Sequence, residues 1–275
     1  MKFAIGPPWL RIAFSPGDDR VAGMLRAIFA HARPGEENGD GPELAVVRTA
    51  EAGEEEGWAA LEGDVFRAGR NSAAAWYDFS ESRGEVTLSP QNGAFVENFV
   101  RQVFIWESYR RGGLVLHSAA FAMEGDVVVS CGESNSGKST LSRILKERVQ
   151  VYSDEMNVVD GEGRVWGLPF LGTGVDRVQV GGGKLRALTF HRPGDDFRAT
   201  ALAPADVARH LWPNVFVPEA IDTALRETVF DLAAAVAART AGFTVEIPLE
   251  ESVTYAGFRN LIKAAALRKE GQHEA

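Results

Sequence analysis

The sequence predicts an α/β protein in which a P-loop domain follows a smaller N-terminal α+β domain. Two observations favour this fold class. Three short apolar stretches separated by turn signals, as expected of buried sheet strands, occupy residues 114–116, 119–123 and 127–130. The last stretch leads directly into a glycine-rich loop, after which Leu141, Ile144 and Leu145 mark the apolar face of a helix.

The N-terminal third shows the mixed pattern of a small α+β domain. One helix is expected over residues 20–31, and the next segment, residues 31–43, has the Gly, Pro and acid content of a solvated loop. A second helix is expected over residues 93–111, because its apolar residues recur at mostly helical spacing and two glycines follow. Strand-like runs stand at residues 11–14, 44–47 and 86–88. We therefore place the first domain at residues 1–112 and the P-loop domain at residues 113–275.

The last third of the chain also mixes strand-like and helix-like segments. Strands are expected at residues 185–190 and 244–247. Helices are expected at residues 204–211 and 220–239, and a final helix follows the second strand. We find no internal repeat.

The composition is that of an ordinary globular protein and argues against nucleic acid as a partner. The chain has 38 acidic and 29 basic residues, and its net charge of −9 should repel polyanions. Its single cysteine, Cys131, cannot form an intrachain disulfide, which fits a reducing compartment. The N-terminus lacks the apolar core of a signal peptide, and no segment is long and apolar enough to span a membrane. We expect a cytoplasmic protein with no membrane partner. Whether the chain forms a homo-oligomer is left open by the sequence.

The glycine-rich loop at residues 132–139 matches the full pattern Gly-x-x-x-x-Gly-Lys-Ser between an apolar strand and a helix. Backbone amides and the helix N-terminus would bind phosphate, Lys138 would bridge the terminal phosphates, and Ser139 would ligate Mg²⁺. The sequence therefore predicts a nucleoside triphosphate site, most simply for ATP with Mg²⁺. The alternative is a glycine-rich turn with an exposed lysine. The expected nucleotide-binding residues are Gly132, Ser134, Asn135, Ser136, Gly137, Lys138, Ser139 and Thr140.

A pair of acids follows the loop after one short helix and one strand-like run. Asp154 stands 16 positions after Lys138, so a helix and a strand can return Asp154 and Glu155 to the phosphate loop. A carboxylate there could hold Mg²⁺ or accept the proton of an attacking hydroxyl. Asp154 is our candidate base, and Ser139, Asp154 and Glu155 are the candidate metal ligands. The alternative is a strand-end turn with solvated acids.

Two further features could contribute to the same site. His117 ends the first apolar stretch, and a histidine near a carboxylate can share a proton, although a structural histidine is the alternative. The loop at residues 181–184 carries Lys184, and Arg186 and Arg192 follow it. Such a loop could close over phosphates, or it could be a plain turn.

The ordered set formed by Leu116-His117, the phosphate loop and Ser153-Asp154-Glu155 resembles the catalytic domain of HPr kinase/phosphorylase. This group includes related serine kinases such as the maturation kinases of lasso-peptide precursors, and its fold is shared by phosphoenolpyruvate carboxykinase. The resemblance covers roughly residues 114–170. It implies that His117 and Asp154 are catalytic, that Asp154 activates a serine hydroxyl, and that Lys138 and Mg²⁺ hold the γ-phosphate.

Three departures from the HPr kinase pattern point away from HPr as the acceptor. Asn135 replaces the usual glycine, Thr140 replaces the usual glutamate, and residues 164–167 lack the acidic residue of the family's Glu-x-x-Gly signature. We therefore expect a Mg-ATP-dependent kinase acting on a serine of a peptide or another small protein. A small-molecule kinase, or a nucleotide-binding regulatory or assembly protein with little turnover, remains as an alternative.

Overall fold

The computed structural model describes most of the chain and divides it into two compact units. The described residues are 2–4, 11–16, 33–34, 43–48, 57–70, 73–88, 93–133, 136–168, 170, 182–218 and 220–271. One unit comprises Met1–Arg110 and Val217–Arg226, and the other comprises Arg111–Phe216 and Glu227–Ala275. The boundary predicted after residue 112 lies two residues beyond Arg110, and no sequence pattern indicated that Val217–Arg226 groups with the first unit.

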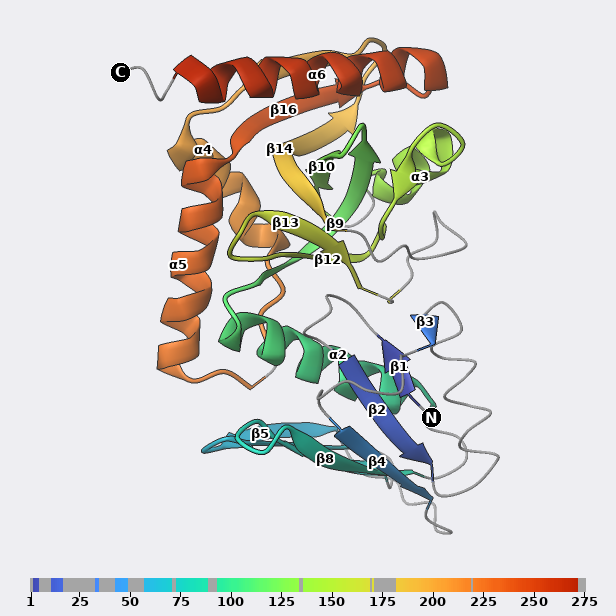
Figure 1. Ribbon diagram of the computed structural model, residues 1–275, viewed down its shortest axis with the longest axis vertical. Coiled ribbons are helices and arrows are strands. Elements are labelled where there is room, and N and C mark those ends of the chain that lie inside the picture. Colours follow the sequence, from blue (N-terminus) through green and yellow to red (C-terminus); the bar gives the residue numbers. More distant parts are fainter. Residues whose placement is uncertain are drawn as a thin grey trace. The chain divides into compact units, whose positions relative to one another are not determined.

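The first unit contains a sheet with strand order β3-β1-β2-β4-β8-β7-β6-β5 and one described helix, α2 (Figure 1). Strands β2, β4 and β8 are parallel, whereas β8, β7, β6 and β5 form an antiparallel meander. The elements are β1 (Lys2–Ala4), β2 (Arg11–Pro16), β3 (Arg33–Pro34), β4 (Glu43–Arg48), β5 (Trp58–Glu62), β6 (Val65–Arg70), β7 (Ala73–Asp78), β8 (Arg83–Leu88) and α2 (Gly93–Arg110).

Helix α2 packs on the meander through aromatic side chains. Phe99 stacks on Phe66 of β6 with 5.4 Å between ring centroids, and the hydroxyl of Tyr77 on β7 donates to Glu107 at 3.0 Å. The strands expected at residues 11–14, 44–47 and 86–88 and the helix at residues 93–111 are confirmed. Strands β5 to β7 were not predicted, and the helix expected over residues 20–31 lies outside the described residues.

The second unit contains an eight-stranded mixed sheet with helices packed against it, and the α/β class is confirmed. Its elements are β9 (Leu114–Met123), β10 (Asp126–Cys131), α3 (Lys138–Leu145), β11 (Gln150–Val151), β12 (Met156–Val159), β13 (Arg164–Gly167), β14 (Gly183–Pro193), β15 (Arg198–Ala201), α4 (Pro204–Leu211), the 3₁₀ turn η1 (Trp212–Asn214), α5 (Thr223–Arg239, in this unit from Glu227 on), β16 (Ala241–Ile247) and α6 (Glu251–Gly271).

Strand β10 is the centre of this arrangement. It pairs with β9 in antiparallel and with β14 in parallel orientation, and β14 is also parallel to β16. Strands β12 and β13 connect β9 to β14 on the other path, so five strands close into a ring. The carboxyl ends of β10, β14 and β16 therefore lie at one edge of the sheet, which is where open α/β sheets bind ligands.

Two helices cover an apolar core on this sheet. Leu141 and Leu145 of α3 and Phe258 and Leu261 of α6 are buried in the same cluster as Phe121 of β9. Figure 1 shows α6 running along the sheet beside β16. The apolar face predicted for α3 is confirmed, because Leu141 and Leu145 are buried and Ile144 packs against the same core.

The prediction of separate strands at residues 114–116 and 119–123 was wrong, because β9 is one continuous strand. His117 consequently lies inside the strand and not at its end. The polar pair His117-Ser118 suggested a break, but the buried hydroxyl of Ser118 lies 3.1 Å from the Asn157 amide that donates to it. A satisfied hydroxyl can occupy a buried strand position at little cost.

Candidate functional site

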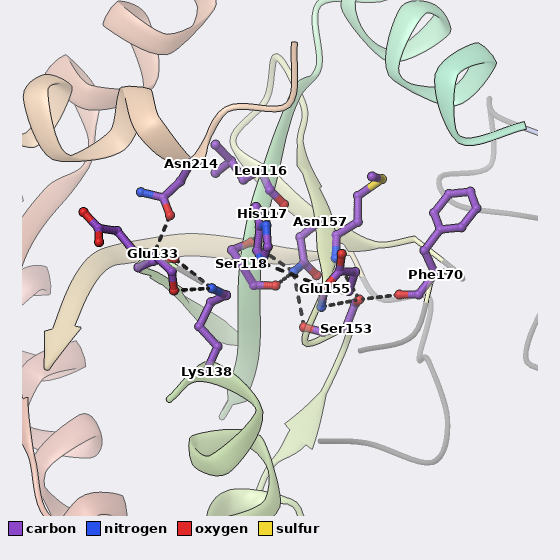
Figure 2. Close-up of polar contacts among 12 residues, drawn as sticks. Leu116, His117, Ser118, Glu133, Lys138, Ser153, Glu155, Asn157, Phe170 and Asn214 are labelled. Carbon is purple, nitrogen blue, oxygen red and sulfur yellow. Dashed lines mark hydrogen bonds and ion pairs between the residues drawn. The ribbon is translucent and has the colours of Figure 1, made fainter. Parts of the chain in front are cut away.

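The glycine-rich loop at residues 132–139, named the phosphate loop for its predicted role, follows the carboxyl end of β10 and leads into α3. The Gly132 amide donates to the side-chain oxygen of Asn214 at 2.9 Å (Figure 2). The Ser136 amide donates to the Glu133 carbonyl at 3.0 Å. Gly137 precedes the first residue of the helix. The expected binding residues Ser134 and Asn135 lie outside the described residues, and the others flank them on the strand and helix sides.

Both motif glycines are required by the local geometry. Gly137 has φ +102°, a left-handed conformation that glycine adopts without the steric cost of a Cβ. A Cβ on Gly132 would lie 2.5 Å from the Ser136 hydroxyl oxygen, well inside contact distance. The glycine spacing that identified the loop in the sequence is therefore the spacing that the folded backbone needs.

Lys138 is held inside the loop. Its ammonium donates to the carbonyls of Gly132 at 2.7 Å and Glu133 at 3.1 Å, and the residue is only 6% exposed (Figure 2). Burial lowers the pKa of this lysine, while the nearby Cys131, Glu155 and Asp154 oppose the shift. The alternative of an exposed lysine on a plain turn is contradicted by this burial.

The acidic step at residues 153–155 is fixed by a serine-centred turn. The Ser153 hydroxyl accepts hydrogen bonds from the backbone amides of Glu155 and Met156 at 3.2 and 3.1 Å. The buried Asn157 amide donates to the Ser153 carbonyl and to the Ser118 carbonyl on β9. Asp154 is 1% exposed, so it is not the solvated acid of the alternative interpretation.

His117 lies beside the second acid of this step. Its Nε2 is 3.9 Å from a carboxylate oxygen of Glu155, because residue 117 pairs with Met156 in the β9–β12 register. The imidazole stacks on Phe216 at 5.5 Å between ring centroids and 5° between ring planes. The expected partnership of this histidine with an acid is thus found with Glu155.

The two acids, His117 and Lys138 form one group beside the phosphate loop. Figure 2 shows the Lys138 side chain reaching from α3 toward the loop carbonyls, with His117 and Glu155 on the strand side. Asp154 and Glu155 oppose the lowering of the Lys138 pKa by burial, as carboxylates within electrostatic range of an ammonium do. A cation, carboxylates and an imidazole beside one of these acids are the groups that phosphoryl transfer uses for charge neutralisation and proton movement.

Mg²⁺ fits this group only as part of a nucleotide complex. The described residues contain no cluster of three His, Cys, Asp or Glu side chains able to hold a metal ion by themselves. Mg²⁺ typically takes one or two protein oxygens and completes its shell with phosphate oxygens and water. Ser139 in the first turn of α3, Asp154 and Glu155 carry the oxygen atoms that would hold Mg²⁺ in such a complex.

Sequence reasoning missed two residues that shape the loop. Asn214 of η1 fixes the loop through the Gly132 amide, and its own amide donates to the His210 carbonyl at 2.9 Å. His191 lies near the end of β14, where its Nδ1 is 2.7 Å from the Ser130 hydroxyl oxygen. The only local signal for His191 was its place at the carboxyl end of an expected strand, and Asn214 had none.

The basic residues that follow the glycine run do not all reach the loop. Lys184 lies opposite Asp126 in the parallel register of β10 and β14. It is therefore at the end of β10 away from the phosphate loop. Arg186 binds Asp126 at 2.8 Å, near the same far end. The position of Lys184 favours the plain-turn alternative for this glycine run. Arg192 does lie at the loop end of β14, where it pairs with Glu246.

Cys131 is the buried strand-end residue that the sequence suggested. It is fully buried, and burial raises the pKa of its thiol to about 12. A thiol in this state is not a nucleophile at neutral pH.

Comparisons with known proteins identify no family for this chain. No protein-family model matches the chain, and no curated protein matches it either. Among the described residues, no helix combines the length and the apolar character that crossing a membrane demands.

Proposed function

We propose that this protein is a Mg-ATP-dependent kinase that transfers the γ-phosphate to a serine hydroxyl of a peptide or small protein. The observation that carries the proposal is the Lys138 ammonium, which a strand-loop-helix motif buries within electrostatic range of Asp154 and Glu155. His117 adjoins Glu155, so it belongs to the same group of side chains. A turn that served only as a connection would have no need to bury a lysine near two acids. The cytoplasm is the proposed setting, and neither nucleic acid nor membrane is a proposed partner.

The phosphate loop would bind the triphosphate before any chemistry. The amides at the N-terminus of α3 and the Lys138 ammonium supply positive potential for the phosphate oxygens. Lys138 already makes two hydrogen bonds to loop carbonyls, and phosphate oxygens would replace or share these acceptors. Mg²⁺, held by Ser139 and, through water, by the acids, would neutralise charge on the phosphates.

The transfer step follows from the same residues. The serine oxygen forms a bond to the γ-phosphorus, the bond from this phosphorus to the β-phosphate bridging oxygen breaks, and ADP leaves. Asp154 accepts the hydroxyl proton in this proposal. His117 and Glu155, at 3.9 Å, form a second pair that can pass or hold a proton beside Asp154.

We also propose that the second unit has the fold of HPr kinase and phosphoenolpyruvate carboxykinase. Support comes from the order of its parts, in which the strand before the phosphate loop has an antiparallel neighbour that carries His117. The acidic step then follows α3 and β11 and pairs with that same neighbour.

The test is incubation of the full chain with γ-labelled ATP, Mg²⁺ and two acceptor sets, a serine-containing peptide library and a mixture of small hydroxylated metabolites. We expect label on peptides with the native chain and none with Lys138→Ala or Asp154→Asn. Lys146→Ala is the control, because Lys146 is an exposed lysine just after the same helix.

The other outcomes separate the alternatives. Transfer that is unchanged in both variants would remove the proposed roles of Lys138 and Asp154. Label on metabolites alone would show a small-molecule kinase, and ATP binding without transfer would show a regulatory or assembly protein. Release of phosphate without any acceptor would instead indicate an ATPase.

A further inference from the structure

A cavity opens beside the phosphate loop on the side away from the acids. Its volume is about 580 Å³, which is within the usual range for small-molecule sites. Ser136 and Thr140, from the loop and the first turn of α3, form one wall, and His191 of β14 forms another. Ile144 and Pro248 add apolar surface, so the cavity begins at the loop and continues along α3.

Two residues that line this cavity each have a buried polar atom with no hydrogen-bond partner in the part of the chain that the structure describes. The atoms are Nε2 of His191 and the hydroxyl oxygen of Ser136. His191 is 8% exposed, and its other ring nitrogen is already bound to Ser130. Because leaving a buried polar atom unpaired is costly, a ligand in the cavity that supplied a partner to either atom would gain binding free energy.

We propose that this cavity binds the nucleoside half of the triphosphate, with His191 Nε2 as a hydrogen-bonding contact to it. The proposal rests on the triphosphate site described above. The apolar surfaces of Ile144 and Pro248 suit the faces of a planar base, and Leu249 at the rim is 75% exposed and can cover it. His191 serves as a neutral contact, because burial and then the nearby Lys138 ammonium lower its pKa to about 4, although the Cys131 backbone opposes the shift.

The strand order gives the bound nucleotide a direction. The acids and His117 lie on the β9 and β12 side of β10, whereas the cavity lies on the β14 and β16 side. A triphosphate on the loop would therefore point its γ-phosphate toward the acids and its nucleoside toward His191. In this direction the γ-phosphate, and not the nucleobase, is the part of the nucleotide that the proposed proton acceptor Asp154 can reach.

Equilibrium binding of Mg-ATP, Mg-GTP and Mg-tripolyphosphate to the full chain tests the cavity. Tripolyphosphate offers the phosphates without a nucleoside. We expect at least one nucleotide to bind about tenfold or more tightly than tripolyphosphate. Ile144→Trp, which fills the cavity one helical turn beyond the loop, should remove this advantage and leave tripolyphosphate binding within about twofold. Glu147→Trp is the matched control, because Glu147 is exposed just after α3.

Two substitutions at His191 test the contact itself. His191→Asn keeps an amide near the Ser130 hydroxyl and removes the Nε2 position, so nucleotide affinity should fall about five- to tenfold. His191→Gln places an amide near the Nε2 position and should restore part of the loss. Circular dichroism checks that each variant is folded.

The failure of this inference differs from the failure of the proposed function. Equal affinity for nucleotides and tripolyphosphate, or nucleotide binding that Ile144→Trp leaves unchanged, would overturn the nucleoside site while the phosphate site stands. No binding of any of the three compounds would overturn both.

Discussion

Two histidines flank the same phosphate loop, and their surroundings suit them to different work. Cys131, the last residue of β10, pairs with Ser118 on β9 and with Phe190 on β14, so His117 and His191 lie at equivalent positions on the two neighbouring strands. His117 is about one-third exposed and lies beside a carboxylate. His191 is buried and bonded to the Ser130 hydroxyl, and the Lys138 ammonium is within electrostatic range of it.

The two histidines have the same side chain, so their different proposed roles follow from the side of β10 on which each one lies. A partly exposed imidazole next to Glu155 can take part in proton movement. A buried imidazole whose pKa is about 4 stays neutral at physiological pH and can only donate or accept a hydrogen bond. We therefore propose that phosphate transfer takes place on the β9 side and nucleoside binding on the β14 side.

The largest expected effect is on the acidic side of the loop. Asp154→Asn keeps the shape of the side chain and removes its basicity, so the single-turnover rate of phosphate transfer should fall about 10²- to 10⁴-fold. ATP affinity should change far less. Glu162→Gln removes an exposed acid a few residues later and should have no effect on the rate. A normal rate in Asp154→Asn would move the base elsewhere and weaken the contrast between the two sides.

The next effect concerns the dependence of stability on pH that His191 causes. The unfolded imidazole has a pKa of about 6.5, whereas the folded one has a pKa of about 4, so only the unfolded state takes up the proton between these values. Stability should therefore be independent of this group above pH 6.5 and fall as the pH drops toward 4. The loss at pH 4 is on the order of 3 kcal/mol.

Denaturant unfolding of the native chain and of His191→Asn at pH 7, 5 and 4 measures this contribution. The free energy of unfolding should fall more steeply with acid in the native chain than in the variant. Parallel curves would show that His191 is not held neutral by its surroundings.

A smaller effect is expected from His117. His117→Asn should lower the transfer rate about 10- to 100-fold at saturating ATP, since the His117–Glu155 pair assists Asp154 and does not replace it. His210→Asn is the control, because His210 is an exposed histidine that packs on Phe190. Equal rates for both variants would assign His117 a structural role in its stack on Phe216.

The smallest effect is expected from Asn214. Asn214→Ala leaves the Gly132 amide without its side-chain acceptor, and such a loss costs about 1–2 kcal/mol of folding stability. A thermal unfolding scan measures the change, with Asn260→Ala as an exposed control. A variant as stable as the native chain would show that Asn214 does not fix the start of the loop.

Much of the second unit could be predicted because its signals are local. The run from β10 through the loop into α3 follows from apolar residues, glycine spacing and helical periodicity within about twenty residues. Helix α4 was predicted with its observed bounds at Pro204–Leu211, since proline stands at its first position and apolar residues follow at helical spacing.

The parts that could not be predicted depend on register and on distant residues. Asn214 reaches Gly132 across 82 positions, and His191 reaches the loop only because β14 is parallel to β10. The same parallel register moves Lys184 away from the loop. Strands β6 and β7 escaped detection because their buried positions include small alanines, which give a weak apolar alternation.

Calorimetric titration of Mg-ATP into the native chain and into Lys138→Ala tests the central claim most directly. The account predicts saturable binding by the native chain and a loss of at least about 100-fold in the variant, since a buried ammonium in contact with phosphate would be removed. Circular dichroism and a thermal scan would establish that the variant is folded. No binding by the native chain, or equal binding by the two proteins, would contradict the account.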